Sequence, residues 1–256
     1  ARLQKTEWPE RMMRYIMQAS LYLQFEQQAL QTPNAPCLSD GEQTISYKEA
    51  LRYIDAIAQQ LYSKGVRSGN VVALYCEKSI NAVPAFLAIS RLGAVTLTLD
   101  TSFPVNMLEF ILEDANVQWV LCQNAFPIDT NLPKVALPKP FDPVLSREQQ
   151  RDCPKVSSDQ NIAWIVYSSG TTGQPKGIEL SHQAILSSIF SRYQVSPYET
   201  NDKVACCIYF FWEIFRPLFR GACAYVLSDK TLLDTDRYRQ YIEQNQITET
   251  LWTPSF

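Results

Sequence analysis

The chain has 256 residues, 46% of them hydrophobic, and a formal net charge of −3 from 23 basic and 26 acidic residues. This composition is sufficient for a large globular core, and the sequence contains no basic tract of the kind that binds nucleic acid. The longest apolar stretch, residues 71–99, is interrupted by charged residues and a proline, so it does not predict a membrane-spanning helix.

Helix and strand patterns alternate along the first half of the chain. The predicted elements are a helix over residues 47–61, a strand over 71–76, a helix over 82–92, a strand over 95–99, a helix over 107–116 and a strand over 119–122. Gly65 is a stop signal for the first of these helices. Strand, helix and strand in succession form a βαβ unit, which predicts a parallel sheet.

The middle of the chain has no periodicity. Residues 125–154 contain six prolines, which predict a loop or linker. We therefore divide the chain into a first α/β subdomain with an N-terminal entry helix at 1–124, a proline-rich linker at 125–155, and a second α/β subdomain at 156–256. Because the chain begins without methionine and no turn closes its last element, we expect it to be part of a longer protein, with the second subdomain truncated.

The alternation resumes in the second half. Its predicted elements are a strand over residues 162–167, a helix over 182–190, a strand over 204–208, a helix over 211–219, a strand over 224–227 and a helix over 236–245. The sequence thus predicts an α/β fold with two mostly parallel sheets and flanking helices. We expect one sheet on each side of the proline-rich stretch.

The most informative segment is the loop at residues 167–177, Tyr-Ser-Ser-Gly-Thr-Thr-Gly-Gln-Pro-Lys-Gly, which ends a predicted strand. Its glycines let backbone N–H groups approach an anion, its Ser and Thr hydroxyls add donors, and Lys176 adds a positive charge. A P-loop is excluded because Gly177 rather than Ser or Thr follows Lys176, and no Gly-x-Gly-x-x-Gly fingerprint is present. The composition therefore predicts a phosphate-binding loop of another kind.

This loop resembles the signature loop of the adenylate-forming enzymes, in particular the adenylation domains of nonribosomal peptide synthetases and related carboxylate-activating enzymes. Other segments are similar to further blocks of that family in the same order, namely residues 25–28 with 32–35, 45–51 through 66, and 89–95 followed by Asp100 and Pro104. Several blocks in order are a more specific signal than one loop. The resemblance implies that the chain is the incomplete N-terminal core of such an enzyme.

The resemblance also implies that the loop holds the β- and γ-phosphates of ATP. By matching position, the nucleotide-binding residues are Ser168, Ser169, Gly170, Thr171, Thr172, Gly173 and Lys176. Thr171, Thr172 and Lys176 would also act in catalysis, because donors held against the departing pyrophosphate offset the charge that it gains.

Residues 207–215 resemble the family block that lines the acyl pocket. A typical amino-acid-activating domain has an aspartate there that binds the substrate ammonium group, and Ile208 stands at that position. The segment leading into the block is shorter than usual, so the register is open and a carboxylate could come from elsewhere. In the direct register, an ammonium group buried beside Ile208 would be costly, which favours aryl, hydroxy or keto acids, or a quaternary ammonium acid bound by aromatic faces. We predict Ile208, Tyr209 and Trp212 as substrate-binding residues.

By resemblance, the enzyme converts a carboxylic acid and ATP, with Mg²⁺, into acyl-AMP and pyrophosphate. The acid is either an amino acid or an acid whose amine is modified or absent. The acyl group then passes to the phosphopantetheine thiol of a carrier (thiolation) domain. The family's Mg²⁺-linked glutamate, ribose-binding aspartate and C-terminal catalytic lysine have no counterpart in this chain. We therefore expect the Mg²⁺ ligands to lie mostly outside it, and the 256 residues alone to be inactive. Two alternatives stay open: an acyl-CoA ligase that uses coenzyme A as acceptor, and a non-catalytic partner-binding module that retains the fold.

The cysteines and the single histidine predict no further chemistry. The seven cysteines form no C-x-x-C pair and mostly lie in apolar runs, which is typical of reduced thiols in a cytoplasmic protein. With His182 as the only histidine, a metal site built on imidazole groups has little support, and we predict no metal-ligating residues.

Overall fold

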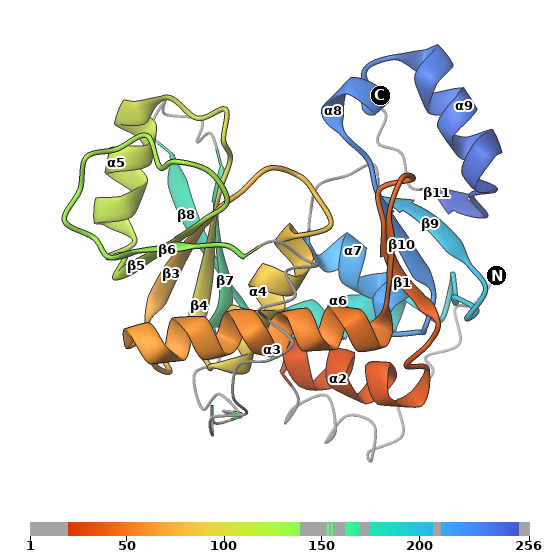
Figure 1. Ribbon diagram of the computed structural model, residues 1–256, viewed down its shortest axis with the longest axis horizontal. Helices are drawn as coiled ribbons and strands as arrows, with labels where there is room; N and C mark the ends of the chain where they lie inside the picture. The colour runs from red at the N-terminus through yellow and green to blue at the C-terminus, as the bar shows by residue number, and fades with distance from the viewer. Residues whose placement is uncertain are drawn as a thin grey trace, which may run out of the picture.

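The computed structural model describes residues 20–138, 153, 155, 162–168, 175–206 and 211–250. Within this part of the chain, two mostly parallel β-sheets are flanked by helices (Figure 1), which confirms the predicted fold class. No helix among these residues is long and apolar enough to cross a membrane.

Sheet I has the strand order β6-β5-β3-β4-β7-β8. Its strands are β3 (Val71–Tyr75), β4 (Val95–Leu99), β5 (Trp119–Cys122), β6 (Lys134–Ala136), β7 (Ile162–Ser168) and β8 (Lys176–Ser181). Neighbouring strands are parallel except for β8, which pairs antiparallel with β7. The carboxyl ends of the parallel strands therefore share one edge of the sheet, the usual place for ligands in parallel sheets.

Sheet II has the strand order β11-β9-β10-β1-β2. Its strands are β1 (Pro36–Ser39), β2 (Thr44–Ser46), β9 (Lys203–Cys206), β10 (Cys223–Val226) and β11 (Glu249–Thr250). β1 pairs parallel with β10, and the two outer neighbours β9 and β11 continue the parallel arrangement. Only β2 is antiparallel to its neighbour.

The helices follow the predicted order, except that α8 (Asp229–Leu232) was not predicted. They are α2 (Leu21–Gln31), α3 (Tyr47–Lys64), α4 (Ala82–Arg91), α5 (Val105–Asp114), α6 (His182–Arg192), α7 (Phe211–Leu218), α8 (Asp229–Leu232) and α9 (Thr235–Asn245). The α3 helix begins with a capping box between Ser46 and Glu49 and ends at Gly65, whose φ of 113° is left-handed. The predicted stop at Gly65 is confirmed.

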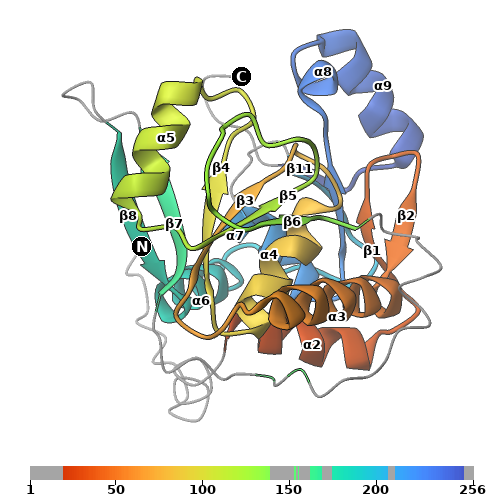
Figure 2. The same cartoon turned by 60° about the vertical axis from the view of Figure 1, so that its left-hand side comes forward.

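One core joins the two sheets. The α4 helix lies between them (Figures 1 and 2), and all ten of its residues are buried. The Phe86 ring in α4 packs edge-on against Trp164 of β7 and Phe215 of α7, with ring centroids 5.9 and 5.2 Å apart. The α4 helix thus packs on sheet I directly, and through Phe215 on α7, the helix that packs on β9 and β10 of sheet II. Burial of α4 therefore helps to hold sheet I against sheet II.

The predicted helices and strands are present with bounds shifted by a few residues; the strand predicted over 204–208 is described as far as Cys206. The expectation of one sheet on each side of the proline-rich stretch is wrong. Strands β7 and β8 complete sheet I, whereas β1 and β2 belong to sheet II. Apolar periodicity specifies the type of an element, but the pairing of distant strands depends on the whole fold.

The prediction of an irregular linker over 125–154 is wrong in one place, because strand β6 lies within it. Its three residues pair in parallel with β5, and the Val120 N–H also donates a hydrogen bond to the Pro133 carbonyl oxygen at 3.0 Å. A strand this short at the edge of a sheet leaves little pattern in the sequence. The division of the chain at 1–124, 125–155 and 156–256 into subdomains stays a prediction, although the sheets do not follow it.

Candidate functional site

The β7–β8 hairpin holds both ends of the predicted phosphate loop. In the strand register Ser168 pairs with Lys176, and both side chains are exposed to solvent. Burial decreases along β7 from Ala163 toward Ser168, so the first half of the strand is fixed in the core while its end is open to a ligand. The other predicted nucleotide-binding residues lie outside the described residues: Ser169, Gly170, Thr171, Thr172 and Gly173.

Tyr167, the first residue of the loop segment and part of β7, is held by two contacts. Its hydroxyl donates a hydrogen bond to Asp114 Oδ2 at 2.5 Å. Burial and this hydrogen bond to a carboxylate raise the pKa of Tyr167, so the phenol stays protonated at neutral pH. On the opposite strand Gly177 pairs with Tyr167, and the absence of a side chain there leaves room for the ring.

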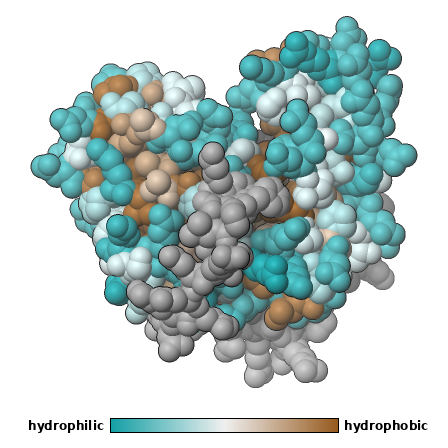
Figure 3. Space-filling view, viewed as in Figure 1, coloured by the Kyte–Doolittle hydropathy of each residue, from teal (hydrophilic) through white to brown (hydrophobic). Residues whose placement is uncertain are grey.

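A cavity of about 520 Å³ lies beside the end of β7, between the two sheets. It is lined by Cys76, Glu77, Lys78, Thr98, Leu99, Asp100, Thr101, Phe103, Trp164, Val166, Tyr167, Ser228, Asp229 and Lys230. These residues come from the ends of β3, β4 and β7 on one side and from the start of α8 on the other. The space-filling view shows a corresponding notch between the two lobes of the molecule (Figure 3).

Polar contacts fix the walls of this cavity. Lys78, after β3, forms an ion pair with Asp229 of α8 at 2.8 Å, which links the two sides. Asp100, after β4, accepts hydrogen bonds from the Ser102 N–H at 2.9 Å and the Ser102 hydroxyl at 2.7 Å. Deeper in the wall, the Trp164 indole N–H donates to Thr98 Oγ1 at 2.9 Å. The cavity therefore combines aromatic surfaces with charges of both signs.

Cys76 is the one thiol among the residues that line the cavity. Burial, followed by the nearby charge of Glu77, raises the pKa of the Cys76 thiol to about 12. A thiol with this pKa is protonated at neutral pH and is a poor nucleophile. The arrangement thus favours binding by this cavity rather than covalent catalysis through Cys76.

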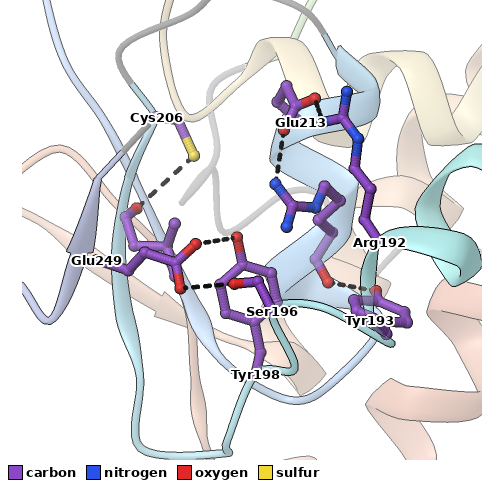
Figure 4. A network of polar contacts seen from close by, with 9 residues as sticks. Arg192, Tyr193, Ser196, Tyr198, Cys206, Glu213 and Glu249 are labelled. Atoms are coloured by element: carbon purple, nitrogen blue, oxygen red, sulfur yellow. Dashed lines mark hydrogen bonds and ion pairs between the residues drawn. The ribbon is translucent and has the colours of Figure 1, made fainter. Parts of the chain in front are cut away.

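The predicted acyl pocket is only partly described. Ile208 and Tyr209 lie outside the described residues, and Trp212 is described as part of α7 without its side chain. The structure does describe the polar contacts that follow directly in α7, which we call the α7 anchor. The Glu213 carboxylate is buried in α7, where it pairs with Arg192 of α6 and, at 2.9 Å, with Arg216 (Figure 4).

The α7 anchor continues toward sheet II through two tyrosines. The Tyr193 hydroxyl donates a hydrogen bond to the Arg216 carbonyl oxygen at 2.5 Å, and the Arg216 guanidinium lies 5.2 Å from the centre of the Tyr198 ring. Tyr198 in turn donates to Glu249 of β11 at 2.8 Å (Figure 4). These contacts fix the start of α7 relative to α6 and β11.

Sequence reasoning missed most of the residues that line the cavity. Glu77 and Lys78 follow β3 and Asp100 follows β4, so charged residues directly after buried parallel strands were an available signal. Asp229 and Lys230 had no such signal, because α8 joins the cavity only through the packing of the two sheets.

Comparison with known proteins identifies the family. The sequence profile of the AMP-binding enzymes matches residues 25–256, and the chain belongs to this family. The chain is 33% identical to glycine betaine reductase ATRR of Emericella nidulans over 234 residues, which are 90% of this chain and 18% of that protein. It is 29% identical to tyrocidine synthase 1 of Brevibacillus parabrevis over 253 residues, which are 94% of this chain and 23% of that protein.

Solved structures show the same fold. A four-domain nonribosomal peptide synthetase bound to AMP and glycine matches with a TM-score of 0.78 and 22% identity, over 94% of this chain and 18% of that one. VinN in complex with L-aspartate matches with a TM-score of 0.79 and 21% identity, over 93% of this chain and 68% of that one. The resemblance to adenylate-forming enzymes is therefore confirmed, and the chain spans about a fifth of the curated relatives named above.

Proposed function

We propose that this chain forms the ATP-binding region of an enzyme that activates a carboxylic acid as its acyl adenylate. The observation that carries the proposal is the pairing of Ser168 with Lys176, the two described ends of the glycine-rich segment, at the carboxyl edge of sheet I next to Tyr167, which lines the cavity. Membership in the AMP-binding enzyme family supports the same conclusion.

In the proposed reaction, a carboxylate oxygen of the acid attacks the α-phosphorus of ATP. A new C–O–P bond forms, the bond between the α-phosphorus and the bridging oxygen breaks, and pyrophosphate leaves with that oxygen. The glycine-rich backbone at Gly170 and Gly173, with Ser168 and Ser169, would hold the β- and γ-phosphates. Thr171, Thr172 and Lys176, as further donors, would stabilise the charge that develops on pyrophosphate. Mg²⁺, which neutralises phosphate charge when bound, would be held mostly by groups outside this chain.

The proposed acid lacks a primary ammonium group. Ile208, Tyr209 and Trp212 would line its pocket, and Ile208 offers no charge to an ammonium group. One relative is named for glycine betaine, whose nitrogen is quaternary and is suited to aromatic faces rather than to a single carboxylate. We therefore propose a betaine-like acid first, with aryl, hydroxy and keto acids as the other members of the class.

The proposed acceptor of the acyl group is the phosphopantetheine thiol of a carrier domain, because a solved structure with the same fold belongs to a four-domain nonribosomal peptide synthetase. An acyl-CoA ligase is the second candidate: an o-succinylbenzoate coenzyme A synthetase shares the fold with a TM-score of 0.77. Supplying the adenylate with either coenzyme A or a phosphopantetheine-loaded carrier distinguishes these acceptors. A protein that fails to bind ATP would instead be the non-catalytic module.

The test is pyrophosphate release by the natural protein that carries this chain. The panel contains matched acids with the same carbon skeleton: glycine, dimethylglycine, glycine betaine and glycolate. We expect release to increase with N-methylation and to be weakest with glycine. Equal or faster turnover of ordinary amino acids would show that Ile208 does not occupy the ammonium site. The 256 residues alone, assayed in parallel, are expected to give no turnover.

A further inference from the structure

Tyr167 is fixed from two sides at the base of the phosphate loop. Its hydroxyl hydrogen-bonds to Asp114 Oδ2 at 2.5 Å, and its ring lies over Gly177 of the opposite strand. A Cβ atom placed on Gly177 would come within 3.0 Å of Tyr167 Cζ, so a larger residue there would push the ring away. The ring position thus depends on Asp114 at one end and on Gly177 along its face.

Asp114 is itself held by a rigid element. It is the last residue of α5, a helix whose side chains Leu108, Ile111 and Leu112 are buried against sheet I. The helix lies next to the β7–β8 hairpin in both ribbon views (Figures 1 and 2). The Tyr167–Asp114 hydrogen bond therefore ties the base of the loop to a helix that is anchored in the core. Short hydrogen bonds from a hydroxyl to a carboxylate are among the stronger ones in proteins.

The position of Tyr167 determines where the loop begins. Its neighbour Ser168 pairs directly with Lys176, so a shift of the Tyr167 backbone moves both ends of the loop. The same ring forms part of the cavity wall, together with Lys78 and Asp100. A change in ring position would consequently alter the phosphate loop and the neighbouring surface of the cavity at once.

We propose that Tyr167 and Asp114 are positioning residues for the phosphate loop: their hydrogen bond sets the direction in which β7 enters the loop. This inference rests on the proposed function of the loop as the ATP site. Neither residue needs to touch ATP, because a displacement of about 1 Å in the groups that do is enough to lower the rate about a hundredfold. The effect should fall on ATP and leave the affinity for the acid unchanged.

The experiment compares Tyr167→Phe, Asp114→Ala and Asp114→Asn in the natural protein. Two quantities are measured: the KM values for ATP and for the acid in pyrophosphate exchange, and the Kd of a non-hydrolysable ATP analogue. We expect Tyr167→Phe and Asp114→Ala to raise the KM and Kd for the nucleotide about tenfold, which is about 1.4 kcal/mol, with the KM for the acid within twofold. Asp114→Asn keeps an acceptor oxygen and should recover most of the nucleotide affinity.

The matched control is Tyr22→Phe, which removes a tyrosine–carboxylate hydrogen bond of 2.8 Å to Glu26 within α2. It should leave both KM values unchanged, whatever it does to the melting temperature. The double variant Tyr167→Phe/Asp114→Ala should raise the KM and Kd for the nucleotide no more than either single variant does, because both substitutions remove the same hydrogen bond. The proposal would be overturned if Tyr167→Phe bound the ATP analogue within twofold of wild type. It would also be overturned if the KM for ATP and the KM for the acid increased equally.

Failure of the proposed function is a separate outcome. A wild-type protein that binds the ATP analogue but activates no acid would refute acid activation, while the Kd comparison would still decide the role of Tyr167. A wild-type protein that binds no nucleotide would refute both.

Discussion

At the scale of single residues, Lys176 is the described cation of the proposed phosphate loop, and its side chain is exposed opposite Ser168, where a ligand can reach it. We predict that Lys176→Ala lowers kcat/KM for ATP about a hundredfold, since removal of one donor from a site of developing charge typically has an effect of this size. The measurement is pyrophosphate exchange at varied ATP concentration.

Two further variants make this prediction specific. Lys134→Ala removes another exposed lysine from edge strand β6, far from the loop, and should have no effect on exchange. Lys176→Arg retains the charge but not the compact ammonium group, and should retain part of the activity. A Lys176→Ala variant with normal ATP kinetics would mean that this side chain is only a solvated surface residue.

His182 gives a prediction on pH. The imidazole is buried at the start of α6, where Nδ1 accepts a hydrogen bond from the Leu21 N–H at 3.3 Å. Burial lowers the pKa of His182 from 6.5 to about 4. Between these values the unfolded chain binds a proton that the folded chain does not, so the stabilisation present above pH 6.5 is lost as the pH falls toward 4.

The measurement is the free energy of unfolding in urea at pH 7.5 and pH 5.5. From His182 alone we expect a loss of about 1.4 kcal/mol over this interval. His182→Gln keeps an acceptor for the Leu21 N–H and does not titrate. Its free energy of unfolding should therefore decrease less between pH 7.5 and pH 5.5, by about 1.4 kcal/mol, than that of the wild type. Identical losses in the two proteins would show that the imidazole is protonated in the folded state or is accessible to solvent.

At the scale of elements, the Glu213 carboxylate joins α6 to α7. It is buried between Arg216, which is also buried, and Arg192, which is partly exposed. Glu213→Gln leaves the Arg216 guanidinium in the core without this counter-charge, and we predict a loss of about 3 kcal/mol in the free energy of unfolding. Arg192→Ala removes the partner at the surface and should cost about 1 kcal/mol or less. Equal costs for the two variants would mean that Glu213 is solvated.

Elements with strong local patterns could be predicted from the sequence. The predominantly apolar α4, β3 and β4 are examples, because the apolar residues of each element indicate directly that it is buried. Strand β8 could not be predicted, since its first four residues are exposed and alternate only weakly. The candidate site was predicted where residue type matches the chemistry, as at Lys176, but Asp114 and Asp229 approach it only through tertiary packing.

At the scale of the whole molecule, strands from both ends of the chain are interleaved. Strands β1 and β2 depend on β10 for their place in sheet II, and β7 depends on β4 for its place in sheet I. The α4 helix is covered from both sides, so separating the halves would expose its buried surface. Stability is therefore a property of the two sheets together.

We predict that residues 1–124 and 156–256, produced separately, do not fold, although they match the division expected from the proline-rich stretch. Each piece would lack strand partners in both sheets, because β1 pairs with β10 and β4 pairs with β7. The first piece would also expose the buried surface of α4, and the second would expose the apolar side chains that pack on it. Circular dichroism and urea titration of each piece should show no cooperative transition, whereas the two pieces mixed together should recover helix and strand signals through non-covalent pairing. A cooperative transition in either piece alone would show that the halves are independent domains, and that the shared sheets form only after each has folded.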